Sequence, residues 1–391
     1  MQDRLVPPPP ARRAAADPGS APPTDPSSGS AGLRLPVLPP VDPMLARAAG
    51  AVPEPDAVPG GLWFEPKWDG FRCIVFYDGS AEDEPAVELG SRGGKPLTRY
   101  FPEVVAELRR QLGDARCVVD GEVVVRRGEP GAERLDWDAL SQRIHPAASR
   151  VRTLAQETPA SFVAFDLLAE EDEDLQATPA EERRRRLEAL WGALEAPLHL
   201  TQRTEDPDLA RRWLEDFEGA GLDGVVAKPR TARYEPGKRV MTKVKHARTA
   251  DVVVVGYRVH KSGEGVGSLL LGLRAPGAEG FSQVGGASAF TAARRRELVE
   301  ELAPHVERDA DGEPLRGAGE RNRFSASKDG SFVVVRPELV CEVGYDQLEK
   351  GRFRHVVRFL RWRPDRDPLS CTTDQVEVPA AYDLEAVLSR A

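Results

Sequence analysis

One lysine of the sequence, Lys67, stands where covalent chemistry is possible, within the run EPKWDGFR at residues 65–72. Apolar residues surround it and a turn-forming Asp-Gly pair follows, so Lys67 is expected at the edge of a strand. A lysine attacks phosphorus only as the neutral amine, and partial burial or neighbouring cations lower its pKa towards that form. Taken alone, Lys-x-Asp-Gly is also an ordinary turn. The cations available to act on Lys67 are Arg72, Lys228, Lys243 and Lys245.

The pattern Lys67-x-Asp69-Gly70-x-Arg72 resembles the nucleotidyltransferase motif shared by ATP-dependent DNA ligases, RNA ligases and mRNA capping enzymes. Segments similar to the other motifs of that superfamily follow in the same order and carry the resemblance from residue 65 to residue 366. They are SRGG at 91–94, DGE at 120–122, AFDLL at 164–168, DGVVAK at 223–228, KVK at 243–245 and RPDR at 363–366. The runs 140–146, 164–168 and 245–251 resemble the compact bacterial ATP-dependent ligases called ligase C, and capping enzymes lack them.

The resemblance implies that Lys67 is the covalent nucleophile, which attacks the α-phosphorus of ATP to give lysyl-AMP and pyrophosphate. In the implied ATP site, Glu65 accepts from the adenine amino group and Phe165 stacks on the base, while cations bind phosphate oxygens. Glu122 contacts the ribose or a metal ion, and Asp223 contacts a metal ion, Mg²⁺ or Mn²⁺. The implied ATP-binding residues are Glu65, Arg72, Arg92, Glu122, Phe165, Lys228, Lys243 and Lys245.

The last motif is implied to act on the pyrophosphate leaving group from a second domain, through Arg363, Asp365 and Arg366. Asp223 and Arg366 depart from the common pattern. Asp223 stands where Glu is usual. Arg366 stands where Lys is typical, which replaces a compact ammonium by a planar guanidinium with several donors. A third departure, Met241, occupies a position that is often Trp.

Several of these residues also have simpler interpretations. Phe165 could be a core aromatic, because apolar strand residues are usually buried, and Arg92 could make only a surface salt bridge. Glu122 and Asp223 could cap turns. Asp69 is implied to lie near the attacking 3′-hydroxyl, or it belongs to a plain Asp-Gly turn.

The elements that must position these residues fall into two groups. Short strands are predicted at 73–77, 117–125, 161–168 and 224–227, and helices at 102–111, 180–194 and 208–220. The helix at 180–194 holds Arg183–Arg186, for which a solvated face with i,i+4 pairs to Glu181 and Glu182 is predicted. Beyond residue 248, strands are predicted at 252–259, 268–273, 331–335, 339–343 and 356–363 with one helix at 292–302, which fits an OB-type barrel. The Gly-rich run 262–268 is predicted to be a hairpin turn.

The predicted fold is therefore α+β: a nucleotidyltransferase (adenylation) domain over 35–247 followed by an OB-fold β-barrel domain over 248–391. Residues 1–34 are predicted to be a disordered tail, because residues 1–30 hold eight of the 34 prolines and few large apolar side chains. With 391 residues, 40% hydrophobic and 30% charged, the chain is expected to be globular.

No apolar run approaches the roughly 20 residues of a membrane span, and no signal peptide is evident, so a cytoplasmic, nucleoid-associated location is expected.

The charge distribution and the cysteine spacing limit the classes of function that the sequence can support. The net charge of −9 argues against a surface coated for nucleic acid, but residues 350–366 carry seven basic residues against one acid, a stripe expected to hold DNA phosphates. Four widely separated cysteines argue against an all-cysteine zinc site and against a disulfide framework. The sequence thus predicts an ATP-dependent DNA ligase acting in DNA repair, monomeric, with nicked double-stranded DNA as substrate and DNA-repair proteins as possible partners. An RNA ligase and an inactive DNA-binding relative are the alternatives, and an NAD-dependent ligase is disfavoured.

Overall fold

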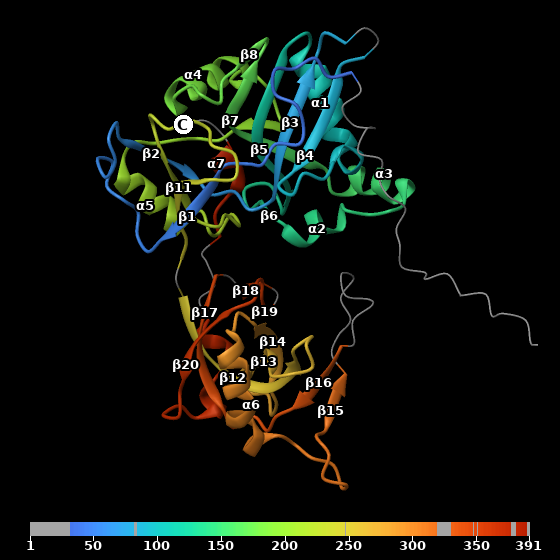
Figure 1. The fold of residues 1–391 in the computed structure, drawn as a ribbon, viewed down its shortest axis with the longest axis vertical. Coiled ribbons are helices and arrows are strands. Elements are labelled where there is room, and N and C mark those ends of the chain that lie inside the picture. Colours follow the sequence, from blue (N-terminus) through green and yellow to red (C-terminus); the bar gives the residue numbers. More distant parts are fainter. Residues whose placement is uncertain are drawn as a thin grey trace, which may run out of the picture.

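The computed structural model describes residues 32–81, 84–246, 248–318, 330–346, 348–349, 351–376 and 381–388. Two bodies follow one another along the chain, and each has its own hydrophobic core (Figure 1). The first contains the strands up to β11 and the helices up to α5, and the second contains the barrel strands from β12 onward with α6. No helix within the described ranges is long and apolar enough to cross a membrane.

The larger sheet of the first body has the strand order β4-β3-β5-β7-β8, with β6 beside β5 and β9 beside β7. Its central strands are rich in valine and other apolar residues and are buried almost throughout, as expected for a sheet covered on both faces. All its pairings are antiparallel except β7 with β9. The strands are β3 (Phe71–Asp78), β4 (Ala86–Ser91), β5 (Arg116–Arg127), β6 (Arg134–Leu135), β7 (Ala160–Glu170), β8 (Glu173–Asp174) and β9 (Leu198–Leu200).

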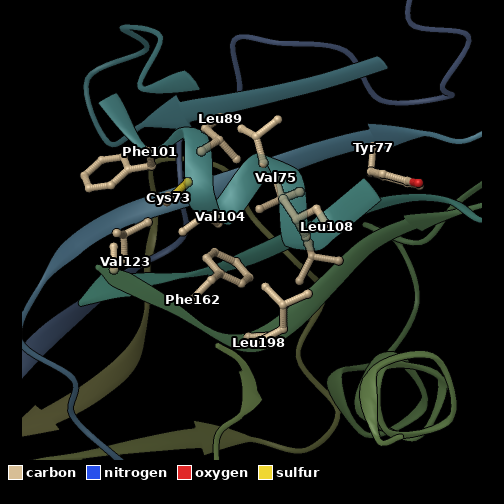
Figure 2. Packing of buried hydrophobic residues seen from close by; sticks show 14 of the residues in the cluster. Cys73, Val75, Tyr77, Leu89, Phe101, Val104, Leu108, Val123, Phe162 and Leu198 are labelled. Carbon is tan, nitrogen blue, oxygen red and sulfur yellow. The ribbon is translucent and has the colours of Figure 1, made fainter. Parts of the chain in front are cut away.

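Helix α1 (Pro102–Leu112) covers one face of this sheet (Figure 2). Val104 and Leu108 lie one turn apart on its buried side and pack with Val75 and Phe162 of the sheet, because helical residues four apart share a face. Proline at the first helical position and a glycine with φ of 57° after the last one set its ends. The neighbouring helices are α2 (Trp137–Gln142), α3 (Ala148–Glu157) and α4 (Ala180–Trp191).

A second, four-stranded sheet of the first body has the order β1-β11-β10-β2 and places three sequence motifs side by side. Strand β2 ends directly before Lys67, and β10 lies between β2 and β11, with Val226 opposite both Glu65 and Lys243. Helix α5 (Pro207–Asp216) packs on β2. The strands are β1 (Leu45–Ala49), β2 (Leu62–Pro66), β10 (Val225–Pro229) and β11 (Arg239–Val244).

The second body is a curled sheet in which β12 pairs with β17 along its first half and with β16 further on. Gly256 allows the close packing, because a Cβ there would lie 2.7 Å from the Phe332 ring. Besides α6 (Ala292–Leu302), this body contains β12 (Arg248–Val259), β13 (Val266–Leu273), β14 (Ser282–Ala287), β15 (Arg316–Ala318), β16 (Ser331–Val334), β17 (Val340–Tyr345), β18 (Leu348–Glu349), β19 (Arg352–Phe353) and β20 (Arg358–Trp362). Short 3₁₀ turns lie at Thr98–Tyr100, Ala303–His305, Pro368–Ser370 and Thr373–Gln375.

Most predicted elements are confirmed, with shifts of one to four residues at their ends. The helix at 292–302 has its predicted bounds, and residues 262–265 form the turn between antiparallel β12 and β13. Helices α4 and α5 end earlier than predicted, at Trp191 and Asp216. Residues 1–31 of the predicted tail lie outside the described residues, and Arg34 donates its backbone N–H to Asp78 at 2.6 Å. The four cysteines are buried and free.

The solvated helix face predicted for Arg183–Arg186 is wrong for its first two arginines, which are buried. Ala180, Arg183, Arg184, Leu187 and Trp191 recur every three or four residues and form the inner stripe of α4. Only the outer arginines pair as surface residues: Glu182 accepts from both Arg185 and Arg186, whereas Glu181 binds Arg230.

The C-terminal helix α7 (Leu384–Leu388) returns from the barrel to the first body (Figure 1). Leu384, Val387 and Leu388 are buried in the cluster that includes Trp213 and Phe217. The backbone N–H of Leu384 donates to the Glu133 carbonyl at 2.9 Å, and Glu385 accepts from Arg126 at 2.7 Å. The last described helix therefore anchors the end of the chain on the body that contains Lys67.

Replacing Leu384 by alanine should destabilise the first body by about 2–5 kcal/mol, because it removes a fully buried side chain and leaves a cavity. The matched control is Leu369→Ala, at a leucine that is 53% exposed in the barrel, for which a change within about 0.5 kcal/mol is expected. Urea unfolding of the two variants measures the difference. Equal midpoints for Leu384→Ala and Leu369→Ala would show that α7 is not docked in solution.

Candidate active site

A cavity of about 240 Å³ opens between the two sheets of the first body. Eight of the nine residues predicted to react with or bind ATP line it, and only Lys245 does not. Strands of both sheets contribute, so the cavity exists only where the two sheets meet. The predicted residues on its wall are Glu65, Lys67, Arg72, Arg92, Glu122, Phe165, Lys228 and Lys243, beside wall residues such as Met44 and Met241.

Lys67 is held by a backbone exchange with the segment that starts at Asp223. Its N–H donates to the Gly224 carbonyl at 2.8 Å, and its own carbonyl accepts from the Asp223 N–H at 3.0 Å. Gly224 has φ of 139°, and a Cβ there would lie 2.0 Å from the Val244 carbonyl oxygen. Only glycine fits this position, so the close approach of the two segments depends on it.

Asp223 joins two ammonium groups beside the cavity. Its Oδ2 lies 2.6 Å from Lys67 Nζ and 2.7 Å from Lys245 Nζ, and Lys245 also binds Asp346 of the barrel at 2.9 Å. Burial raises the pKa of Asp223, but the charges of Lys67 and Lys245 outweigh burial and lower it overall. Burial lowers the pKa of Lys245, whereas Asp223 and Asp346 raise it above its usual value.

The third lysine of this group, Lys243, has no such carboxylate partner among the described residues and lines the cavity. Burial and the positive charges of Lys67 and Lys245 lower the pKa of Lys243. Two ammonium groups, of Lys67 and Lys243, thus line the cavity, and that of Lys245 lies beside them on Asp223, so all three would stabilise the negative charge of a polyphosphate.

Glu65 and Lys228, both in the lining, form a buried ion pair with Oε2 and Nζ 2.7 Å apart. The other oxygen of Glu65 accepts from the Trp63 indole at 2.9 Å and lies 3.6 Å from Arg184. Lys228 therefore sits with Glu65 rather than with the Lys67 cluster, so its contribution is to hold the carboxylate predicted to recognise adenine.

Phe165 is half-buried and lines the cavity, which argues against the interpretation as a plain core aromatic. The Arg72 guanidinium lies 4.5 Å and the Lys228 ammonium 4.8 Å from its ring centroid. Behind it, Arg183 binds both carboxylate oxygens of the adjacent Asp166, at 2.8 and 3.0 Å. Cations thus fix the position of this strand segment from both sides.

Glu122 faces the cavity from β5 and accepts from the Gly70 N–H at 3.2 Å. Burial raises the pKa of Glu122 to about 7, although the charges of Arg72 and Lys67 act in the opposite direction. No group of three or more His, Cys, Asp or Glu side chains suited to a metal ion occurs in the described part of the chain. Glu122 and Asp223 are therefore separate carboxylates, each beside cations.

The barrel touches this region through the segment between β17 and β20. Arg354 pairs with Asp69 of the nucleophile motif and lies 4.8 Å from the Trp137 ring centroid. Asp69 is therefore more than a turn residue, and it contacts the second body.

The predicted pyrophosphate residues do not reach the cavity. Arg363 pairs with Asp365 at 2.8 Å and with Asp251 at 3.0 Å, and Arg366 lies 3.4 Å from Asp251, all within the barrel. Arg361 is likewise paired with Glu342. The basic stripe is therefore not a row of free cations, and Lys350 lies outside the described residues.

Four residues for which the sequence predicted no role in the site contact its residues or their neighbours from outside the cavity. They are Asp120, Arg183, Arg184 and Tyr234. For the arginines a signal existed, since both fall on the apolar stripe of the helix at 180–191. For Tyr234 no local pattern indicates its contact with Asp120, 114 residues away.

Comparison with known proteins identifies the family. The sequence model described as "ATP dependent DNA ligase domain" matches residues 43–245, and that of the "ATP dependent DNA ligase C terminal region" matches residues 262–366. DNA ligase C1 of Mycolicibacterium smegmatis is 52% identical over 364 residues, which cover 91% of this chain and 99% of the relative. DNA ligase C of Mycobacterium tuberculosis is 50% identical over 371 residues, with the same coverage.

A solved structure, Pmar-Lig_PreS3, shares the fold with a TM-score of 0.53 at 17% identity, over 83% of this chain and 68% of that chain. The matched families and relatives favour neither an RNA ligase nor an inactive relative. The predicted fold class is confirmed. The chain belongs to the ATP-dependent DNA ligase family, in its compact bacterial form.

Proposed function

We propose that Lys67 is the nucleophile of ATP-dependent nick sealing and that the cavity beside it binds ATP. The supporting observation is that Lys67 and Lys243, with Lys245 next to them on Asp223, line the same cavity as Glu65 and Phe165. If the polyphosphate of ATP lies beside the lysines, their positive charges stabilise its negative charge. The purine can then stack on the aromatic ring of Phe165.

In the first step, the neutral amine of Lys67 attacks the α-phosphorus of ATP. An N–P bond forms, the bond from the α-phosphorus to the bridging oxygen breaks, and pyrophosphate leaves with the electron pair. Asp223 orients Nζ through its 2.6 Å contact, but its lowered pKa makes it a poor final acceptor, so the amine proton passes to the departing pyrophosphate or to solvent water. The AMP then passes to the 5′-phosphate of a nick, and the 3′-hydroxyl displaces it to form the phosphodiester bond.

The donor set fits a divalent metal that is bound largely through ATP and water. Magnesium sites of this kind need only one or two carboxylates from the protein. Glu122 has one oxygen committed to Gly70, and its charge is disfavoured by burial, which a cation would relieve. We propose that Glu122, with Asp223, holds Mg²⁺ or Mn²⁺, which would neutralise phosphate charge when bound.

The substrate and setting follow from the family. Nicked double-stranded DNA is the substrate class that the family implies. We propose that the protein acts as a monomer in the cytoplasm with the nucleoid, and that repair proteins bring it to nicks. The division into domains at residues 34 and 247 likewise stays a prediction.

Lys67→Ala and Lys67→Arg should both abolish formation of the covalent enzyme–AMP adduct, because alanine has no amine and a guanidinium stays protonated. Denaturing gels after incubation with α-labelled ATP measure the adduct. Lys238→Ala serves as the control, since Lys238 does not line the cavity, and it should label like the parent. Wild-type labelling of either Lys67 variant would exclude this residue as the nucleophile.

Arg363→Ala should slow lysyl-AMP formation at least about tenfold, equivalent to about 1.4 kcal/mol, if the barrel closes over the pyrophosphate during charging. Sealing of a nick that already carries AMP should fall far less, because no pyrophosphate is present in those steps. Arg361→Ala, two residues away at the end of β20 and paired with Glu342, is the control. Equal losses in both assays would instead assign Arg363 to DNA holding.

Glu122→Gln should stabilise the ATP-free protein more at pH 8.5 than at pH 5.5. The pKa of Glu122 is about 7 when folded and near its ordinary value of 4.5 when unfolded, so between these values the folded state alone keeps the proton. Raising the pH through this window therefore favours unfolding of the wild type, and glutamine removes the effect.

Melting temperatures of variant and parent at the two pH values, without metal, measure the difference. Glu107→Gln is the control, because hydrogen bonds from Gln111 and Arg110 lower the pKa of Glu107 and its ionisation is complete throughout that range. A pH-independent effect of Glu122→Gln would contradict the raised pKa.

A further inference from the structure

Tyr234 lies behind the nucleotide cavity, in the connection between β10 and β11, and is only 3% exposed. It belongs to none of the motifs that carry the family resemblance. Its hydroxyl donates to Asp120 Oδ2 at 2.6 Å and accepts from the Met44 N–H at 3.0 Å. One side chain thus links β5, which carries Asp120, to the segment that forms the wall of the cavity at Pro43–Ala46.

Asp120 in turn fixes the guanidinium of Arg72. Its two oxygens accept from Arg72 Nε and Nη2, each at 2.5 Å, and Nη2 also donates to the Met44 carbonyl at 3.3 Å. Arginine has five N–H donors in a planar fork, so this arrangement commits three of them. The two donors on Nη1 make no hydrogen bond to any described residue, and Arg72 lines the cavity. They are the donors left for a nucleotide.

The hydroxyl of Tyr234 matters to this arrangement because Asp120 is completely buried. Burial and the charge of Asp120 raise the pKa of Tyr234, so its hydroxyl stays protonated and remains a donor. Without it, Asp120 Oδ2 loses one of its two hydrogen bonds, and the Met44 N–H loses its acceptor. A buried carboxylate that loses one donor depends on its remaining donors, here those of Arg72, and the pair can change its orientation.

We propose that Tyr234 is a positioning residue for the charging step: through Asp120 and Met44 it holds the Arg72 guanidinium with its Nη1 edge towards the nucleotide. The proposal rests on the proposed role of Arg72 in binding ATP. Tyr234 does not itself line the nucleotide cavity, so its effect passes through the orientation of Arg72 and through the wall residue Met44.

The test is Tyr234→Phe, which removes the hydroxyl and keeps the ring. The ratio of maximal rate to KM for ATP in lysyl-AMP formation should fall about fivefold to tenfold, because a misplaced ligand loses much of its contribution to the reacting geometry. Sealing of a nick that already carries AMP should change less than about twofold, since it requires no ATP binding.

The matched control is Tyr77→Phe, at another buried tyrosine, whose hydroxyl donates to the Gly113 carbonyl at 2.7 Å away from the cavity. If loss of a buried hydrogen bond acted only through stability, both variants would melt earlier and neither would lose ATP use selectively. A selective loss in Tyr234→Phe alone supports positioning. Wild-type charging by Tyr234→Phe, or equal effects of the two variants, would overturn it.

The same substitution in an Arg72→Ala background separates this proposal from the one on which it rests. If Tyr234 acts through Arg72, the second substitution should change charging less than about twofold once the guanidinium is absent. A full additional loss in that background would overturn the route through Arg72. If Arg72→Ala alone leaves charging unaltered, the proposed ATP contact of Arg72 fails, whatever Tyr234 does.

Discussion

The carboxylate of Asp223 is the interaction on which the arrangement of the site depends. A polyphosphate site needs several cations close together, yet in the free protein those cations repel one another at short range. Asp223 lies within 2.7 Å of both Lys67 and Lys245, and it offsets this repulsion where burial weakens screening by water. Its backbone N–H also donates to Lys67, so charge and backbone position are set by the same residue.

The neighbourhood of Asp223 is possible only because of the strand order β1-β11-β10-β2. Antiparallel pairing of β10 with both neighbours brings residues 65–67, 223–226 and 243–245 together at one end of the sheet. The larger sheet then closes the cavity with Arg72, Glu122 and Phe165. The residues that meet at the cavity are far apart in sequence, so the two sheets, rather than any local motif, create the site.

The parts of this site that local sequence predicts are those with a local physical cause. In the fold, the helix at 292–302 and the buried valine strands follow from periodicity and side-chain shape. In the site, the lysines are recognisable within short motifs. The pairing of Glu65 with Lys228 and of Arg72 with Asp120 could not be predicted, because each depends on which strands become neighbours. The error at Arg183 and Arg184 has a similar origin: a run of charge indicates solvent only until a buried carboxylate, here Asp166 or Glu65, compensates it.

In its present position, the barrel does not bring Arg363 and Arg366 to the nucleotide cavity. Arg354 pairs with Asp69 and Asp346 with Lys245, so the barrel here presents the segment between β17 and β20 to the first body. Arg363 and Arg366 meanwhile pair with Asp251 inside the barrel and do not line the cavity. For these arginines to reach the pyrophosphate, the barrel must turn about the connection near residue 247, which would break the contacts of Arg354 and Asp346. The α7 helix is docked on the first body through its own buried face. The chain therefore connects the barrel to the first body twice, before β12 and again at α7.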